Sequence, residues 1–219
     1  MHTNAELARQ NMIENQVRPW EVLDPRVLDV LSAVRREDFV PARYRNLAFA
    51  DTALPLGHDE VMMKPVIEGR VLQALGLNAD DRVLEIGTGS GFLTACIARL
   101  AMSVTSVELH ADFAESARAR IAASGAKNVD IRIADAVKDF DTDERFDAVV
   151  VTGAVFSLPD RFRKWVGPSG RLFAIVGESP AMQAMLCTRA DASHWREESL
   201  FETDLPYLTN AAPPRRFAL

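Results

Sequence analysis

The sequence has few cysteines, no long apolar run and no cluster of basic residues. Its two cysteines, Cys96 and Cys187, stand far apart inside apolar segments. This favours buried thiols in a reducing compartment over a disulfide framework. No apolar stretch approaches the ~20 residues that a membrane-spanning helix needs, and the first residues lack the apolar core of a signal peptide. These absences predict a cytoplasmic protein that does not bind membranes.

Basic residues are outnumbered and scattered. The 25 lysines and arginines face 31 acidic residues, the net charge is −6, and no Lys/Arg run is longer than a pair. Aromatic residues are not interleaved with the basic ones, so no nucleic-acid surface is predicted. The four histidines, His2, His58, His110 and His194, show no paired ligand spacing, and no metal site is predicted from them.

The chain divides by pattern into two parts. Residues 1–75 carry helix signals, such as Asp24-Pro25 before an apolar stripe and Gly76 as a C-cap after another. Residues 76–219 carry the signals of an α/β domain. With 219 residues, 48% of them hydrophobic, the chain can bury a sizeable core. We expect a helical cap, 1–75, packed on the mouth of the α/β domain in one compact unit.

From residue 81 onward, short apolar runs alternate with amphipathic stretches. The expected strands are 82–86, 103–108, 129–134, 146–152 and 171–177, and the expected helices are 91–100, 112–124 and 158–166. Runs that are apolar on both faces and separated by helices are typical of a parallel sheet covered on both sides. This predicts a doubly wound, Rossmann-like α/β fold, with residues 182–190 and 197–208 as antiparallel edge strands.

The clearest motif is VLEIGTGSGFLTACIARL, residues 83–100. A strand is expected to end at Ile86, glycines follow at 87, 89 and 91, and a helix begins at once. Glycine permits the sharp turn and lets a ligand approach the backbone. The N–H groups at the start of the next helix then point toward whatever lies above the loop.

Three acidic residues accompany this loop. Glu108 ends the second expected strand, where a carboxylate can accept hydrogen bonds from ribose hydroxyls. Asp135 ends the third, where it can reach an adenine amino group. Glu85 is a charge inside an apolar strand, and we interpret it as a ligand contact through the loop, the alternative being a structural carboxylate.

The combination resembles the class I S-adenosylmethionine-dependent methyltransferases. A dinucleotide site is disfavoured because the spacing is G-x-G-x-G rather than G-x-G-x-x-G, and a kinase-type phosphate loop lacks its Gly-Lys-Ser/Thr ending here. The resemblance implies S-adenosylmethionine as cofactor. The residues implied to bind it are Val61, Met62, Glu85, Gly87, Thr88, Gly89, Ser90, Gly91, Glu108, Leu109, Asp135, Ala136 and Thr152.

Further segments resemble one family within that class, the protein-L-isoaspartate O-methyltransferases. The similar segments are MIENQVRPWEVLDPRVLDVLSAVRREDFVP, FADTALPLGH, VLEIGTGSGFLTA, KNVDIRIADA, FDAVVVTGA and GPSGRLFAIVGE. The resemblance covers residues 12–180 well and the C-terminal forty residues loosely. It implies methyl transfer to a carboxylate on a protein or peptide.

The stretch LGHDEVMMKP, residues 56–65, departs from that family. The family typically has I-G-x-G-Q-T-I-S-x-P here, and its serine hydroxyl is implicated in handling the substrate carboxylate. In this chain Val61 replaces the threonine and Met63 the serine. We take Met63, Lys64 and His58 as the candidate catalytic residues. The methionines could instead line an apolar acceptor pocket or only pack under the loop, Lys64 could be a solvated lysine, and His58 could be structural.

Three functions therefore remain open. The first is an isoaspartyl methyltransferase whose repair activity is weak or lost, and the second is a methyltransferase for another peptide or small-molecule acceptor. The third is a binding module that keeps the cofactor site without chemistry. The sequence does not indicate an oligomeric state.

Overall fold

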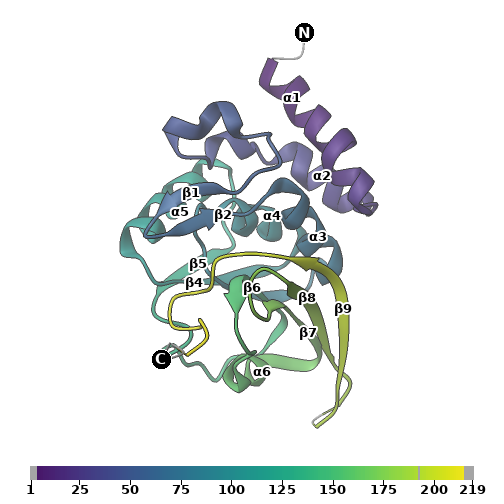
Figure 1. Cartoon of the computed structure of the whole chain (residues 1–219), viewed down its shortest axis with the longest axis vertical. Coiled ribbons are helices and arrows are strands. Elements are labelled where there is room, and N and C mark those ends of the chain that lie inside the picture. The colour runs from purple at the N-terminus through teal and green to yellow at the C-terminus, as the bar shows by residue number, and fades with distance from the viewer. Residues whose placement is uncertain (1–3, 192, 215–219) are drawn as a thin grey trace, which may run out of the picture.

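The computed structural model describes residues 4–191 and 193–214, which form a seven-stranded sheet flanked by helices (Figure 1). The strand order is β5-β4-β3-β6-β7-β8-β9. Strands β3 to β7 pair in parallel, and β8 and β9 pair antiparallel at one edge. The strands are β3 Arg82–Ile86, β4 Ser103–Glu108, β5 Val129–Ile133, β6 Phe146–Val155, β7 Val166–Val176, β8 Met182–Arg189 and β9 Trp195–Thr203. The doubly wound α/β prediction, including the antiparallel edge, is confirmed.

The central strands are apolar on both faces because each face packs against its own core. Val83 and Val150 belong to one hydrophobic cluster, whereas Leu84, Val149 and Val151 belong to the other. Successive side chains of a strand point to opposite sides of a sheet, so the continuous apolar runs supply both cores at once.

Helices cover both faces of the sheet. The helices of the α/β part are α4 Phe92–Leu100, α5 Ala111–Ala123 and α6 Asp160–Lys164. Those of the N-terminal part are α1 Asn4–Met12, η1 Ile13–Val17, η2 Arg18–Trp20, α2 Pro25–Ala33, η3 Arg36–Asp38, η4 Ala42–Leu47 and α3 Pro65–Leu75. The Asp24 side chain caps α2, and Gly76 ends α3 in the left-handed conformation, as the sequence signals predict.

The prediction of an all-helical N-terminal part is wrong around the stretch 56–65. Leu54–Gly57 (β1) and Glu60–Met62 (β2) form a small antiparallel hairpin. Its turn residues His58 and Asp59 both have positive φ, near 50° and 61°, a geometry typical of a tight hairpin turn. Short runs with mixed polarity carry no clear strand period, and this explains why pattern alone did not predict the hairpin.

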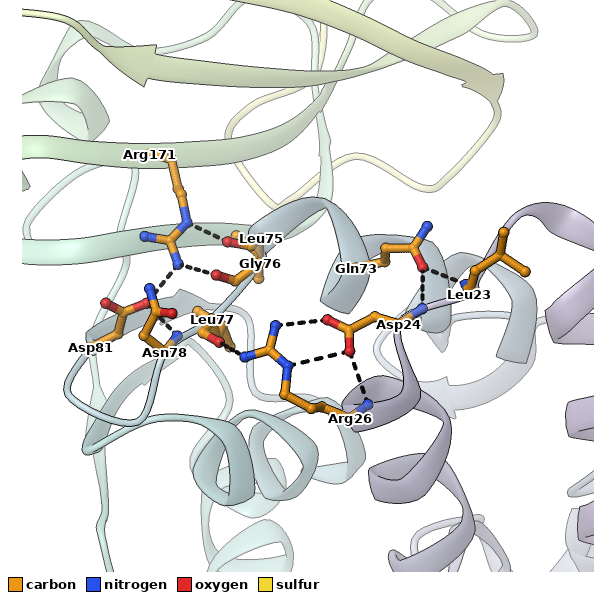
Figure 2. A network of polar contacts seen from close by, with 10 residues as sticks. All are labelled: Leu23, Asp24, Arg26, Gln73, Leu75, Gly76, Leu77, Asn78, Asp81 and Arg171. Carbon is orange, nitrogen blue, oxygen red and sulfur yellow. Dashed lines mark hydrogen bonds and ion pairs between the residues drawn. The ribbon is translucent and has the colours of Figure 1, made fainter.

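Polar contacts join the N-terminal part to the sheet where the two meet in sequence (Figure 2). Arg171 of β7 donates to the carbonyl oxygen of Gly76 and pairs with Asp81 at 2.6 Å. From the other side, Arg26 of α2 donates to the carbonyl oxygen of Leu77 at 2.8 Å. The segment after α3 is thus held by both parts. The division at residue 75 into a cap and a domain stays a prediction.

The N-terminal helices lie against a face of the sheet rather than over its mouth. Helix α2 contacts α4, and α3 contacts β7. The part that reaches the carboxyl ends of the strands is the β1–β2 hairpin (Figure 1). Within the described residues every helix is too short or too polar to cross a bilayer.

Two boundaries differ most from the prediction. Strand β7 begins at Val166, within the expected helix 158–166, and α6 is correspondingly short. Strand β9 ends at Thr203 instead of 208. The chain beyond it crosses the sheet toward the glycine loop, where Tyr207 bridges to Ala154 of β6 (Figure 1).

Candidate functional site

One cavity, called the main cavity below, lies at the carboxyl ends of the parallel strands and has roughly 600 Å³ of space that is partly open to solvent. This is the place where open α/β sheets bind ligands. Its walls come from the β1–β2 hairpin, the glycine loop, the ends of β4 and β5, and the C-terminal segment. The lining residues are Leu56, Glu60, Val61, Ile86, Gly87, Gly89, Val107, Glu108, Leu109, His110, Phe113, Ala134, Asp135, Ala136, Val137, Thr152, Gly153, Leu208 and Thr209.

The glycine loop is shaped so that no side chain enters this cavity. Gly87 and Gly89 have φ of +96° and +52°, and a Cβ on Gly87 would collide with the Thr152 hydroxyl. That hydroxyl donates to the carbonyl oxygens of Ile86 and Gly87 and so fixes the turn. Gly91 has a different role, because its Cβ would meet Ala117 of α5 at 3.1 Å. Gly91 permits helix packing rather than ligand approach.

Two carboxylates face the cavity from adjacent strand ends. Glu108 accepts hydrogen bonds from the backbone N–H groups of Gly89 and His110, at 2.8 and 2.9 Å. Asp135 accepts from the Val137 N–H at 2.9 Å and from the Asn210 side chain at 2.6 Å. Both carboxylates are held in place by the backbone and line a cavity with space for a nucleoside.

Glu85 lines neither this cavity nor its neighbour. It is fully buried, and its Oε2 accepts hydrogen bonds from Thr94 and Ser106 at 2.5 and 2.6 Å. Burial raises the pKa of Glu85 to about 7, although the two hydroxyl hydrogen bonds oppose the shift. Ser106 also bonds Thr88 of the loop at 2.6 Å. Glu85 therefore supports the glycine loop through Ser106, in agreement with the alternative interpretation as a structural carboxylate.

A second, smaller cavity lies under the hairpin. Its lining residues are Val61, Met62, Met63, Glu68, Gly87, Thr88, Gly89, Ser90, Leu93 and Thr152. Met62 and Met63 are 3% and 5% exposed and belong to the hydrophobic core, so they pack under the hairpin and line the cavity at once. Lys64 is exposed and lines neither cavity.

A buried ion pair anchors the chain just after the hairpin. Arg36 of η3 pairs with Glu68 of α3, and both side chains are almost completely buried. The Arg36 guanidinium also donates to the carbonyl oxygens of Met63 and Ala48, both at 2.8 Å. Burial raises the pKa of Glu68 to about 8, and the Arg36 charge opposes this rise. Sequence reasoning missed this pair because its members are 32 residues apart.

His58 lies at the hairpin turn, outside both cavities. Its Nε2 lies 3.1 Å from the Asp112 carboxylate, and this hydrogen bond lowers the pKa of Asp112. Its ring stacks on His110, with centroids 4.0 Å apart and planes 5° apart. The geometry ties the hairpin to the start of α5 and does not place His58 against a substrate.

Glu60 and Thr209 join the hairpin to the C-terminal segment. Their side chains meet at 3.5 Å beside the main cavity. Burial, and then the charge of Glu108, raises the pKa of Glu60. The C-terminal residues were not predicted to contribute, because only the tertiary fold returns them to the glycine loop.

Comparison with known families agrees with this geometry. The model of the family described as protein-L-isoaspartate(D-aspartate) O-methyltransferase matches residues 7–203, most of the chain. The chain belongs to this family. The chain is thus an S-adenosylmethionine-dependent methyltransferase with the fold of this family.

Individual relatives support the assignment over most of their length. The chain is 36% identical over 192 residues to the protein-L-isoaspartate O-methyltransferase of Methanoregula boonei, covering 88% of each chain. It is 36% identical over 199 residues to protein-L-isoaspartate O-methyltransferase 1 of Rhodopseudomonas palustris, covering 90% of this chain and 81% of the relative.

A solved structure shows the same fold. It is described as a protein-L-isoaspartate O-methyltransferase from Plasmodium falciparum in complex with S-adenosyl-L-homocysteine, and it superposes with a TM-score of 0.78. The sequence identity is 17%, with coverage of 94% of this chain and 99% of that one.

The cavity of this family member fits the cofactor by its own geometry. The glycine loop leaves the cavity floor without side chains, and Glu108 and Asp135 offer carboxylates for hydroxyl and amino groups. Most of the predicted cofactor residues line one or both cavities: Val61, Met62, Gly87, Thr88, Gly89, Ser90, Glu108, Leu109, Asp135, Ala136 and Thr152. Glu85 and Gly91 do not. Sequence reasoning missed the apolar and aromatic walls, such as Phe113, and the C-terminal Leu208.

Proposed function

We propose that the protein transfers a methyl group from S-adenosylmethionine to a carboxylate on a protein or peptide, the reaction for which its relatives are named. The observation that carries this proposal is the position of the β1–β2 hairpin. Glu60 and Val61 line the same cavity as Glu108 and Asp135, so an acceptor bound beneath the hairpin would lie beside the cofactor. The finer claim that the acceptor is an isoaspartyl residue rests on the family alone.

The protein's own side chains need to contribute little chemistry to the proposed methyl transfer. The bound cofactor supplies a methyl group on a positively charged sulfur. A carboxylate acceptor is already ionised at neutral pH, so no general base is required. The protein must place the acceptor in line, exclude water and supply donors that hold the acid. Glu108 and Asp135 would hold the adenosine part, while the hairpin and the segment ending in Leu208 and Thr209 close the cavity.

A second candidate function is methyl transfer to a different acceptor. The family's loop hydroxyls are absent, since Val61 and Met63 occupy those positions, and Glu60 adds a carboxyl group to the cavity wall. Loss of one donor to a developing or bound charge commonly lowers turnover by ~100–1000-fold when nothing replaces it. These replacements favour a less acidic, more apolar acceptor.

The test is methyl incorporation from labelled S-adenosylmethionine into an isoaspartyl peptide by wild type and Met63→Ser. Met182→Ser serves as the control, because Met182 is equally buried but lines neither cavity. Cofactor binding is measured in parallel by calorimetry, so that loss of binding is separated from loss of chemistry.

Each outcome selects one function. Wild-type turnover supports carboxylate transfer and shows that the loop hydroxyls are dispensable. Activity gained only by Met63→Ser, with wild-type binding intact, favours the second candidate. If wild type binds the cofactor stoichiometrically and forms no S-adenosylhomocysteine with any acceptor, the protein is a binding module. The expected cytoplasmic location, the absence of nucleic-acid and membrane partners, and the division of the chain at residue 75 belong to the same proposal.

A further inference from the structure

Two histidines and an aspartate from distant parts of the chain meet at the hairpin turn. His58 belongs to the turn, while His110 and Asp112 begin α5. One ligand atom from each residue lies within 4.8 Å of the other two. Phe113 packs edge-on against both imidazole rings, with centroids 5.2 and 5.4 Å away. The three side chains are therefore already gathered in one place.

The cluster also has unused coordinating capacity. His110 Nε2 is buried and has no hydrogen-bond partner among the residues that the structure describes, and a buried polar atom without a partner is unfavourable. The Asp112 carboxylate lies 3.1 Å from His58 Nε2, so these two groups already face each other. Asp59 completes the turn and Glu60 begins β2, so two further carboxyl groups follow His58 directly in sequence.

We propose that His58, His110 and Asp112 form a binding site for a divalent transition-metal ion of the zinc type. Two imidazoles and one carboxylate are a ligand set that suits Zn²⁺, Co²⁺ and Ni²⁺, and three protein ligands leave a position for water. The two rings are stacked, with planes 5° apart, so their lone pairs lie in two parallel planes and not in one. Binding requires one ring to turn until both point at the ion.

Such an ion would fasten the hairpin to the cofactor side of the cavity. His58 lies two residues before Glu60, and His110 lies two residues after Glu108, whose carboxylate accepts the His110 N–H. Both neighbours line the main cavity. Metal binding would thus reduce opening of the hairpin next to the proposed cofactor site, a role beyond the methyl transfer itself.

The experiment is titration of chelator-treated, tag-free protein with Co²⁺, followed by visible absorption and calorimetry. The variants are His58→Ala, His110→Ala and Asp112→Asn. The control is His194→Ala. His194 pairs with Asp191 at 2.7 Å, but no second histidine lies beside it in the part of the chain that the structure describes. Circular dichroism verifies that each variant is folded.

We expect wild type and His194→Ala to bind one equivalent of Co²⁺ with the same affinity. Each of the three ligand variants should bind at least ~10-fold more weakly, because loss of even a supporting residue typically lowers metal affinity ~10–100-fold. Cobalt binding that is equal in wild type and the folded His58→Ala variant would overturn the proposal. So would binding that is lost in His194→Ala.

Discussion

Replacement of Arg36 by methionine tests how the N-terminal part holds the active-site hairpin. Arg36 is fully buried and donates to the carbonyl oxygens of Ala48 and Met63 while it pairs with Glu68. Methionine fills a similar volume but makes none of these contacts. The variant therefore leaves the Glu68 carboxyl group and two carbonyl oxygens buried without their donor.

The expected loss of stability is large. At pH 9 Glu68 is ionised in the wild-type protein, and removal of one member of a buried ion pair typically destabilises a protein by ~3–5 kcal/mol. At about 2–4 °C per kcal/mol for a chain of this size, the melting temperature should fall by roughly 10 °C. The double variant Arg36→Met/Glu68→Gln removes the orphaned acid as well, and we expect it to recover part of the loss.

The pH dependence supplies a second test. The pKa of Glu68 is raised to about 8 from its ordinary 4.5, so the folded state holds a proton that the unfolded state releases. Stability of wild type therefore falls as the pH rises from about 4.5 and levels off above about 8. Without the opposing charge of Arg36, the pKa of Glu68 rises further. The stability of Arg36→Met should then continue to fall above pH 8, and its gap to wild type should widen.

The assay is urea unfolding at pH 6 and pH 9, followed by tryptophan fluorescence, with wild type, both single variants and the double variant. Equal stability of Arg36→Met and the double variant at pH 9 would refute the reasoning, because the orphaned acid would then have no energetic effect. A gap to wild type that stays constant between the two pH values would refute the assigned role of Glu68.

Three further predictions concern the cofactor site and its support. Gly89→Val should abolish S-adenosylmethionine binding in calorimetry, because the added side chain would enter the cavity from a backbone with φ +52°. Gly125→Val is the control: it strains a similar positive-φ backbone, but its Cβ would have nothing within 4 Å, and this variant should bind normally. Between pH 4.5 and 7 the wild-type protein should lose stability as Glu85 ionises, because its raised pKa makes ionisation oppose folding. Glu85→Gln should remove up to roughly 3 kcal/mol of this decline. If the unfolding free energies of wild type and variant, measured with urea, fell equally with pH, the prediction would be contradicted. Asn210→Gly should weaken cofactor binding several-fold with little change in the melting temperature, since Asn210 donates to Asp135 at the cavity edge and its φ of +70° suits glycine. An unchanged Kd would show that this contact does not orient the carboxylate.

Local sequence determined most of the α/β part. Apolar runs buried on both faces predict parallel strands, and the predicted starts of β3, β4 and β6 agree with the structure. Glycines at 87 and 89 predict the ligand loop because positive φ and an open cavity floor both exclude a side chain. The positions of Glu108 and Asp135 beside the cavity could also be predicted, because the carboxyl ends of parallel strands meet at one edge of the sheet.

The hydrophobic pattern did not predict elements that lack a clear local period. The hairpin of residues 54–62 is too short for a strand signal, and β7 begins five residues before its predicted start because Val166 pairs with Phe146 across a bulge. The hairpin and the start of β7 form through contacts with residues that are distant in sequence, and the local pattern does not indicate these contacts.

The tertiary structure alone decided which side chains act together. It placed Glu85 and Gly91 outside the lining of both cavities, His58 against His110 and Asp112, and the C-terminal segment beside the glycine loop. Sequence specifies secondary structure through periods of two and 3.6 residues. Residues separated by tens of positions in sequence meet only when strand order and helix packing are set. The contacts that support the site, and the cluster of His58, His110 and Asp112, therefore come from the tertiary fold.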